Sequence, residues 1–129
     1  MTSSQPSTDV TIEVVNHTKI VTIHRPEARN SLTLSVLAKL RDVFESSVTN
    51  DSVRCLVLTG AGGHFCAGAD LKKNMEDPLL MERTDEYIGN FHAVIKAIVS
   101  CPKPVIAMVD GAAVGFGADL ALACDLRVV

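Results

Sequence analysis

The chain has 129 residues, of which 47% are hydrophobic and 21% charged, enough for one folded domain with a buried core. A net charge of −3, an aromatic content of 4% and the lack of Trp argue against a nucleic-acid-binding surface, which is typically basic and aromatic. No apolar run approaches the ~18 residues that cross a membrane. We therefore expect neither a nucleic acid nor a membrane as a partner.

The composition of the N-terminus and the pattern of cysteines both bear on the cellular location of the protein. Residues 1–10 are polar and lack the apolar segment of a signal peptide, so we interpret them as a flexible tail before a domain at residues 11–129. The four cysteines form no C-x-x-C pair and are predicted to be buried or partly buried free thiols. They are Cys55, Cys66, Cys101 and Cys124. Both features favour a cytoplasmic protein.

The first predicted elements are a hairpin and a helix. Apolar and polar residues alternate over 11–16 and 20–24, which predicts two antiparallel strands. Arg25-Pro26 ends the second strand. Apolar residues at helical spacing then predict an amphipathic helix over 34–48, with Ser31 or Thr33 as its N-cap.

The rest of the chain alternates strands and helices. Residues 53–59 form a nearly continuous apolar run that predicts a strand buried on both faces, followed by a glycine loop. A second amphipathic helix is predicted over 81–100, a strand over 105–109, a glycine-rich turn over 111–117, a short helix over 118–123 and a strand over 126–129. This order indicates an α/β fold.

The sequence ends inside the last predicted strand. Domains seldom end on an unfinished core element, so we expect the C-terminal part of this domain to be missing. In that case the apolar side chains near the end should be exposed and should promote association. These are Leu120, Leu122, Leu126 and Val128.

Several common catalytic motifs are absent from the sequence. It contains no G-x-S-x-G, G-x-G-x-x-G or G-x-x-x-x-G-K-[ST], which argues against an α/β-hydrolase, a dinucleotide-binding or a P-loop protein. The four histidines share no metal-ligand spacing, and no metal site is predicted.

Two stretches, residues 62–72 and 104–120, each run from a predicted strand into small residues. Backbone N–H groups in such turns can be left unpaired and directed at a ligand, and the second stretch also opens a helix, whose N-terminus favours an anion. Two such donors on one oxygen would make an oxyanion hole. Both turns follow buried strands, so we predict that they lie side by side. Spacing alone favours the alternative interpretation, that both are glycine turns needed for tight packing.

The same stretches carry a family resemblance. FCAGADLK at 65–72 and PVIAMVDGAAVGFGADLALACDLRVV at 104–129 resemble motifs of the enoyl-CoA hydratase/isomerase, or crotonase, family. Arg25-Pro26 with Asn30-Ser31-Leu32 resembles its RP…NAL segment, and CLVLTG at 55–60 resembles the strand before its AGAD loop. The resemblance spans about residues 11–129. It implies a crotonase-like spiral of ββα units that is incomplete at its C-terminus.

The resemblance also implies a substrate and its binding residues. The substrate would be an acyl-CoA thioester, and the backbone N–H groups of Ala69 and Phe116 match the two oxyanion donors that stabilise a thioester enolate. Ala28 and Arg29 would lie near the pantetheine and adenine. The other implied CoA-contacting residues are Ala67, Gly68, Asp70, Leu71, Lys72 and Gly115. No metal or redox cofactor is implied, since coenzyme A is part of the substrate.

Asp119 is the candidate acid or base. Hydratases of the family place a glutamate three residues after the oxyanion glycine, and this position is Asp119 here. The i, i+3 spacing puts Asp119 on the same helix face as Phe116, where it could move a proton, and we expect it to face the two donors rather than solvent. It could equally serve to charge the helix N-terminus.

The chain departs from the hydratase pattern. Asp119 is one methylene shorter than glutamate, and Phe116 replaces a glycine, so that its ring could narrow the acyl pocket. The second carboxylate of the pattern would lie beyond Val129. Asp70 could instead serve as a turn or helix cap, and Lys72 could lie on a solvated helix face.

These observations leave three hypotheses. The first is an enoyl-CoA hydratase-type enzyme of fatty-acid β-oxidation or related catabolism, which as a full-length family member would form a homotrimer or hexamer. The second is a double-bond isomerase of the same family. The third is a non-catalytic fragment that keeps part of the fold.

Overall fold

The computed structural model describes residues 9–70, 76 and 78–129. Within them, five strands form one mixed sheet in the order β1-β2-β3-β4-β5. The strands are β1 (Val10–Val15), β2 (Thr18–Ile23), β3 (Cys55–Gly60), β4 (Val105–Met108) and β5 (Leu126–Val128). The helices are α1 (Leu34–Ser47), α3 (Leu80–Ser100), α4 (Phe116–Ala123) and a short 3-10 helix, η1 (Pro26–Ala28).

The predicted hairpin is confirmed. β1 pairs with β2 in antiparallel register, and the turn between them places Asn16 and His17 at positive φ, as in two-residue hairpin turns. The first strand begins at Val10, which we had assigned to the tail. Val10 is buried, and the His24 amide donates to the carbonyl of Asp9 at 2.6 Å, so the tail boundary at residue 10 was wrong.

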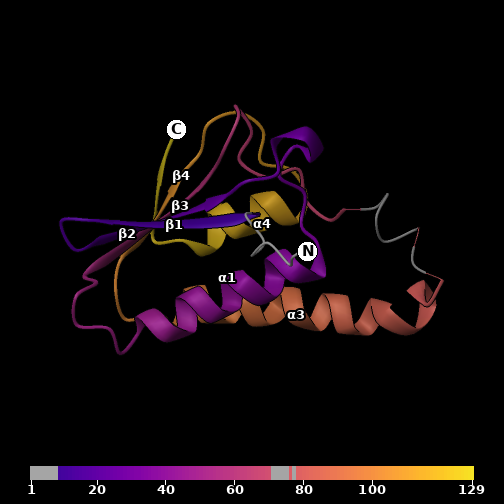
Figure 1. Cartoon of the computed structure of the whole chain (residues 1–129), viewed down its shortest axis with the longest axis horizontal. Coiled ribbons are helices and arrows are strands. Elements are labelled where there is room, and N and C mark those ends of the chain that lie inside the picture. Colours follow the sequence, from indigo (N-terminus) through magenta and orange to yellow (C-terminus); the bar gives the residue numbers. More distant parts are fainter. Residues whose placement is uncertain (1–8, 71–75, 77) are drawn as a thin grey trace, which may run out of the picture.

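The first helix, α1, begins directly after a residue whose side chain caps it. The Thr33 hydroxyl accepts a hydrogen bond from the Val36 amide at 3.1 Å, which identifies Thr33 rather than Ser31 as the N-cap of α1. α1 and α3 run side by side (Figure 1) and close one core with the sheet. The largest buried side chains of this core include Phe44, Phe65, Ile23, Leu37, Leu40 and Leu58.

One face of β3 is more deeply buried than the other. Leu56 and Leu58 are fully buried, whereas Val57 is only half-buried. The prediction of a strand buried on both faces therefore holds only in part, because Thr59 on the second face is buried whereas Cys55 and Val57 are half-buried.

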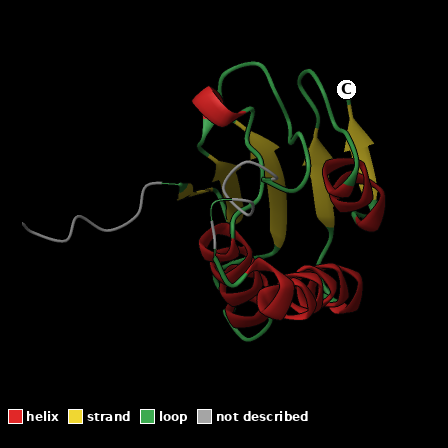
Figure 2. Ribbon diagram, turned by 90° about the vertical axis from the view of Figure 1, so that its right-hand side faces the viewer, coloured by secondary structure: helices red, strands yellow, loops and turns green. Residues whose placement is uncertain are grey.

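The end of the described fold carries exposed apolar residues. Figure 2 shows α4 beside the last strand. Leu122 is 66% exposed and Leu126 60%, and Val128 is exposed as well, as predicted. Leu120 is fully buried, which corrects its predicted exposure, since it lies on the inner face of α4. In the part of the chain that the structure describes, no helix is long and apolar enough to span a membrane.

Candidate active site

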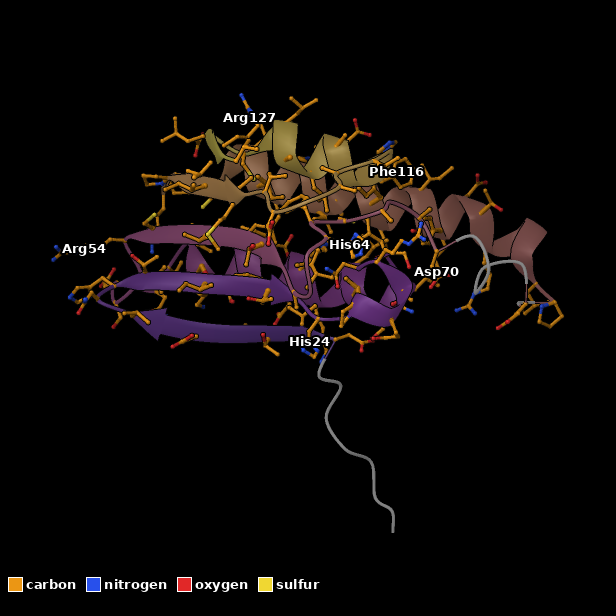
Figure 3. The ribbon with its side chains drawn as sticks, turned by 90° about the horizontal axis from the view of Figure 1, so that it is seen from above. His24, Arg54, His64, Asp70, Phe116 and Arg127 are labelled. Atoms are coloured by element: carbon orange, nitrogen blue, oxygen red, sulfur yellow. The ribbon has the colours of Figure 1, made fainter. Side chains whose placement is uncertain are left out.

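Three loops meet at one edge of the sheet. They follow β2, β3 and β4, which run parallel, so their carboxyl ends share that edge. In open sheets this edge is the usual place for a ligand. Figure 3 shows the labelled His64, Asp70 and Phe116 toward one end of the molecule and Arg54 at the opposite end.

A parallel β-bridge joins the first two loops at Leu32 and Ala69. The Leu32 amide donates to the Gly68 carbonyl at 2.7 Å, and the Asp70 amide donates to the Leu32 carbonyl at 3.1 Å. In a parallel pair this pattern engages the groups on either side of Ala69, so the N–H of Ala69 itself faces away from Leu32. It has no hydrogen-bond acceptor among the described residues.

A second parallel bridge joins the other pair of loops at Cys66 and Ala113. The Cys66 amide donates to the Ala112 carbonyl at 3.1 Å, and the Val114 amide donates to the Cys66 carbonyl at 3.0 Å. Gly117, in the first turn of α4, lies so close that a side chain there would overlap the Cys66 carbonyl. The start of α4 is therefore seated directly on the loop after β3.

Gly68 brings the two predicted donor segments into contact. It has a φ of +98°, which favours glycine, and a side chain on it would lie 2.9 Å from the Val114 carbonyl oxygen and 3.4 Å from the Phe116 nitrogen. Phe116 is the first residue of α4, where an amide has no acceptor inside the helix, and within the described residues its N–H has no other acceptor. Our prediction that the two loops lie side by side is confirmed.

The contact between these two loops at Gly68, which we call the junction, can bind a negatively charged oxygen. It places two unpaired backbone donors, on Ala69 and Phe116, in neighbouring segments, one of them at a helix N-terminus. Fixed donors of this kind bind an oxygen that carries or develops negative charge, and the helix dipole adds to the effect.

The Phe116 ring packs against α3. Its centroid lies 4.0 Å from that of Phe91 with an angle of 11° between the planes, and 6.3 Å from that of Tyr87. The Tyr87 hydroxyl in turn donates to the Leu32 carbonyl at 2.7 Å. The aromatic residues therefore connect α3 directly to the segment of Phe116 and, through Leu32, to the segment that pairs with Ala69, a link that the sequence analysis missed. Narrowing of an acyl pocket by the ring stays a prediction.

Asp119 lies in the first turn of α4 with an exposed side chain. We expected it to face the donors rather than solvent, and its exposure contradicts the second half of that expectation, because α4 lies at the margin of the described fold. The N-cap position is Gly115, and no side-chain hydrogen bond caps α4, so Asp119 does not act through a capping bond. Its role in proton transfer stays a prediction.

Some of the residues predicted to contact coenzyme A lie in loops that are joined to one another, and others lie outside the described residues. Ala28 is half-buried in η1, and the exposed Arg29 follows it at a φ of 55°, with its carbonyl accepting from the Ala67 amide at 3.0 Å. These three residues therefore lie in joined loops, as do Gly68 and the exposed Gly115. The predictions for Leu71 and Lys72 lie outside the described residues.

Asp70 is buried and forms an ion pair. Its Oδ2 lies 3.0 Å from the Nη2 of Arg25, and the Ser31 hydroxyl lies 3.2 Å from the same oxygen. Sequence reasoning gave Asp70 a turn or cap role and assigned nothing to Arg25. The available signal was only an arginine at the end of a predicted strand, next to a proline. Its Nε also lies 3.8 Å from the Asp9 carboxylate.

The Cys66 thiol, which lies in the loop after β3, is not activated as a nucleophile. Burial raises the pKa of the Cys66 thiol to about 11, despite a hydrogen bond from the Gly68 amide, so this thiol stays protonated near neutral pH. The four cysteines are free, as predicted. No three His, Cys, Asp or Glu side chains gather into a candidate metal site in the described part of the chain.

Similarity to known proteins points to one family. The family model for enoyl-CoA hydratase/isomerase matches residues 14–129. An (E)-benzylidenesuccinyl-CoA hydratase from Thauera aromatica is 42% identical over 120 residues, covering 92% of this chain and 46% of that protein. A 1,2-epoxyphenylacetyl-CoA isomerase from Escherichia coli is 37% identical over 116 residues, covering 84% of this chain and 42% of that protein.

A solved structure agrees with these matches. The crystal structure of an enoyl-CoA hydratase from Bacillus anthracis superposes with a TM-score of 0.87 at 31% identity, covering 92% of this chain and 46% of that one. The chain thus spans about half the length of the relatives that it matches. The parallel strands, their joined loops and these matches together show that this chain belongs to the enoyl-CoA hydratase/isomerase family, with the crotonase fold.

Proposed function

We propose that this chain supplies the oxyanion-binding part of an enoyl-CoA hydratase-type site that acts on acyl-CoA thioesters. The observation that carries the proposal is the junction at Gly68, where the unpaired amides of Ala69 and Phe116 lie in adjoining segments. Family membership supports an acyl-CoA substrate, since both similar proteins described above are named for CoA thioesters.

The proposed reaction uses these donors on the thioester carbonyl oxygen. As the oxygen of water bonds to the β-carbon of the enoyl group, one O–H bond of the water breaks and Asp119, three residues after Phe116, accepts that proton. The π pair of the double bond then joins the α-carbon to the carbonyl carbon, and the carbonyl π pair moves to the oxygen, which gives an enolate. The two N–H groups stabilise the enolate, and Asp119 returns a proton to the α-carbon as the carbonyl forms again. Coenzyme A belongs to the substrate, and the proposal includes no other cofactor.

A double-bond isomerase is the second candidate. Isomerisation removes a proton from the α-carbon of a 3-enoyl thioester, which gives a dienolate on the same oxygen, and returns a proton to the γ-carbon, so one carboxylate can serve both steps. The observation that favours it is the short side chain at position 119, since the family's hydratases carry a glutamate there. The similar protein described above that is named an isomerase is named for an epoxide, 1,2-epoxyphenylacetyl-CoA, so the support for this candidate is the side chain at position 119.

Replacement of Asp119 tests the proposed chemistry. In the full natural protein, Asp119→Asn keeps the shape of the side chain and removes its basicity, so we expect turnover of crotonyl-CoA to fall by about 10²–10⁴-fold. Affinity for the acyl-CoA should stay within about two-fold, because the backbone donors are untouched. Unchanged turnover would remove Asp119 from the mechanism.

The products separate the alternatives. A hydratase consumes the enoyl absorbance of crotonyl-CoA and adds the elements of water to the product mass, whereas an isomerase moves the double bond of a 3-enoyl-CoA without changing the mass. Acyl-CoA binding with neither product would favour the non-catalytic hypothesis. A homotrimer or hexamer and a cytoplasmic location complete the proposal, and light scattering of the full natural protein tests the assembly.

A further inference from the structure

We propose that Arg25, Asp70 and Asn30 are positioning residues that hold the Ala69 amide toward the substrate oxygen. None of their side chains needs to contact the substrate. The inference rests on the proposed function, because it concerns one of the two donors that function requires. It is argued from the hydrogen bonds and charges around the loop after β3.

The ion pair acts one residue away from the donor. Asp70 directly follows Ala69, and its Oδ2 lies 3.0 Å from Nη2 of Arg25, with the two side chains 10% and 12% exposed. Arg25 also donates to the Ser31 carbonyl at 2.6 Å and to the Ser31 hydroxyl at 3.1 Å. One guanidinium therefore fixes Asp70 against the segment that pairs with Ala69.

The Asn30 side chain fixes the other end of the same loop. It is fully buried, and its Nδ2 donates to the Ala61 carbonyl at 2.8 Å and to the His64 carbonyl at 2.7 Å. Its Oδ1 accepts from the Arg25 amide at 2.8 Å. Ala61 and His64 begin the loop whose last described residues are Ala69 and Asp70, so the loop after β2 holds it at both ends.

The Arg25 charge has a second consequence. An unpaired carboxylate at Asp70 would repel negative charge that develops on an oxygen at the neighbouring amide. Pairing with Arg25 offsets that charge inside a mostly buried site, where Arg25 also lies 3.8 Å from the more exposed Asp9 carboxylate. The ion pair therefore orients the donor and reduces a repulsion that would oppose an enolate.

The test compares two matched substitutions in the full natural protein. Asp70→Asn removes one carboxylate charge and keeps the size of the side chain. Glu45→Gln makes the same chemical change in the exposed pair with Arg41, whose Nε lies 3.2 Å from the Glu45 carboxylate in α1. The measurements are kcat, KM for crotonyl-CoA, the urea midpoint, and the infrared carbonyl stretch of a bound, isotope-labelled acyl-CoA.

We expect Asp70→Asn to lower kcat by about 10–100-fold, since displacements of about 1 Å at a reacting site have effects of that size. KM should change by less than about three-fold, because the CoA-contacting loops remain. The carbonyl stretch should return most of the way to its value in free acyl-CoA. Glu45→Gln should leave all of these values unchanged.

The outcomes are distinguishable. If the unmodified protein binds acyl-CoA without lowering the carbonyl stretch, the proposed function itself fails. If the stretch is lowered and Asp70→Asn preserves both the stretch and kcat, the function stands and the positioning inference is overturned. Should Asp70→Asn fail to fold, Ser31→Ala removes only the hydroxyl contacts to Arg25 and Asp70. It should shift the stretch and kcat in the same direction by a smaller factor, and no shift would overturn the inference.

Discussion

Alanine at Gly117 would separate the two loops that meet at the donor site. Its side chain would lie 2.8 Å from the carbonyl carbon of Cys66 and 2.9 Å from its Cβ, besides overlapping the carbonyl oxygen. For the carbon at 2.8 Å to reach an ordinary contact of 3.4 Å, the two backbones must separate by at least about 0.6 Å, and the overlapping carbonyl oxygen requires a larger movement. That movement displaces the start of α4 from the loop that carries Ala69.

The magnitude follows from two opposed effects. Overpacking of this kind costs about 1–3 kcal/mol, and the helix preference of alanine over glycine returns up to about 1 kcal/mol. We expect Gly117→Ala to lower the free energy of unfolding by about 1–2 kcal/mol. A backbone shift of that size at the donors should also lower turnover by about 10-fold or more.

Gly89→Ala is the matched control. Gly89 also lies in a helix, α3, and a side chain there would meet nothing within 4 Å, so this change should stabilise the protein by about 0.5–1 kcal/mol and leave turnover unchanged. Urea unfolding and crotonyl-CoA turnover of both variants in the full natural protein are the assays. If Gly117→Ala matched Gly89→Ala in both, the close seating of α4 on Cys66 would have no bearing on the site.

Three further predictions concern the helix cap, the buried thiols and the aromatic stack. Thr33→Ala should lower the free energy of unfolding by about 1 kcal/mol, measured in urea, because α1 loses its side-chain cap. Burial raises the thiol pKa of Cys66 from 9.0 to about 11 and that of Cys124 from 9.0 to about 12. The folded state thus holds these protons more tightly, and stability that is fully present below pH 9 is lost as the pH rises through 11. Cys66→Ala should make the alkaline loss in the free energy of unfolding smaller by about 3 kcal/mol. An unchanged dependence of that free energy on pH would contradict this prediction. Phe116→Leu should cost about 1 kcal/mol through the lost stack on Phe91 and should improve turnover of bulkier acyl groups, measured as kcat/KM across a series of enoyl-CoA thioesters.

The sequence predicted the elements better than the contacts between them. Alternation and helical spacing located the hairpin and α1, and they narrowed the cap to two residues, of which Thr33 is correct. The start of α4 was missed by two residues, because the sequence alone does not show that Gly115 turns the chain at a φ of 57° directly before Phe116.

The candidate site was predictable only in part for a similar reason. The pairing of the two glycine loops followed from where parallel strands end. The network of Arg25, Asn30 and Asp70 joins residues up to 45 positions apart, and no local pattern encodes such partners. The network also depends on left-handed backbone at Arg29 and Asn30. Residues other than glycine rarely adopt this conformation, and the spacing of residues in the sequence does not reveal it.

In the two loops, amides that donate a hydrogen bond alternate with amides that do not. This difference should affect the rate at which backbone hydrogens exchange with solvent. The Asp70 amide is bonded to Leu32 and the Gly117 amide to Val114, whereas the preceding amides of Ala69 and Phe116 have no acceptor within the described residues. In deuterated water, each unbonded amide should therefore exchange quickly next to a slowly exchanging neighbour. A bound thioester would slow exchange at these two positions, so the site can be mapped by its own hydrogens even where no reaction takes place.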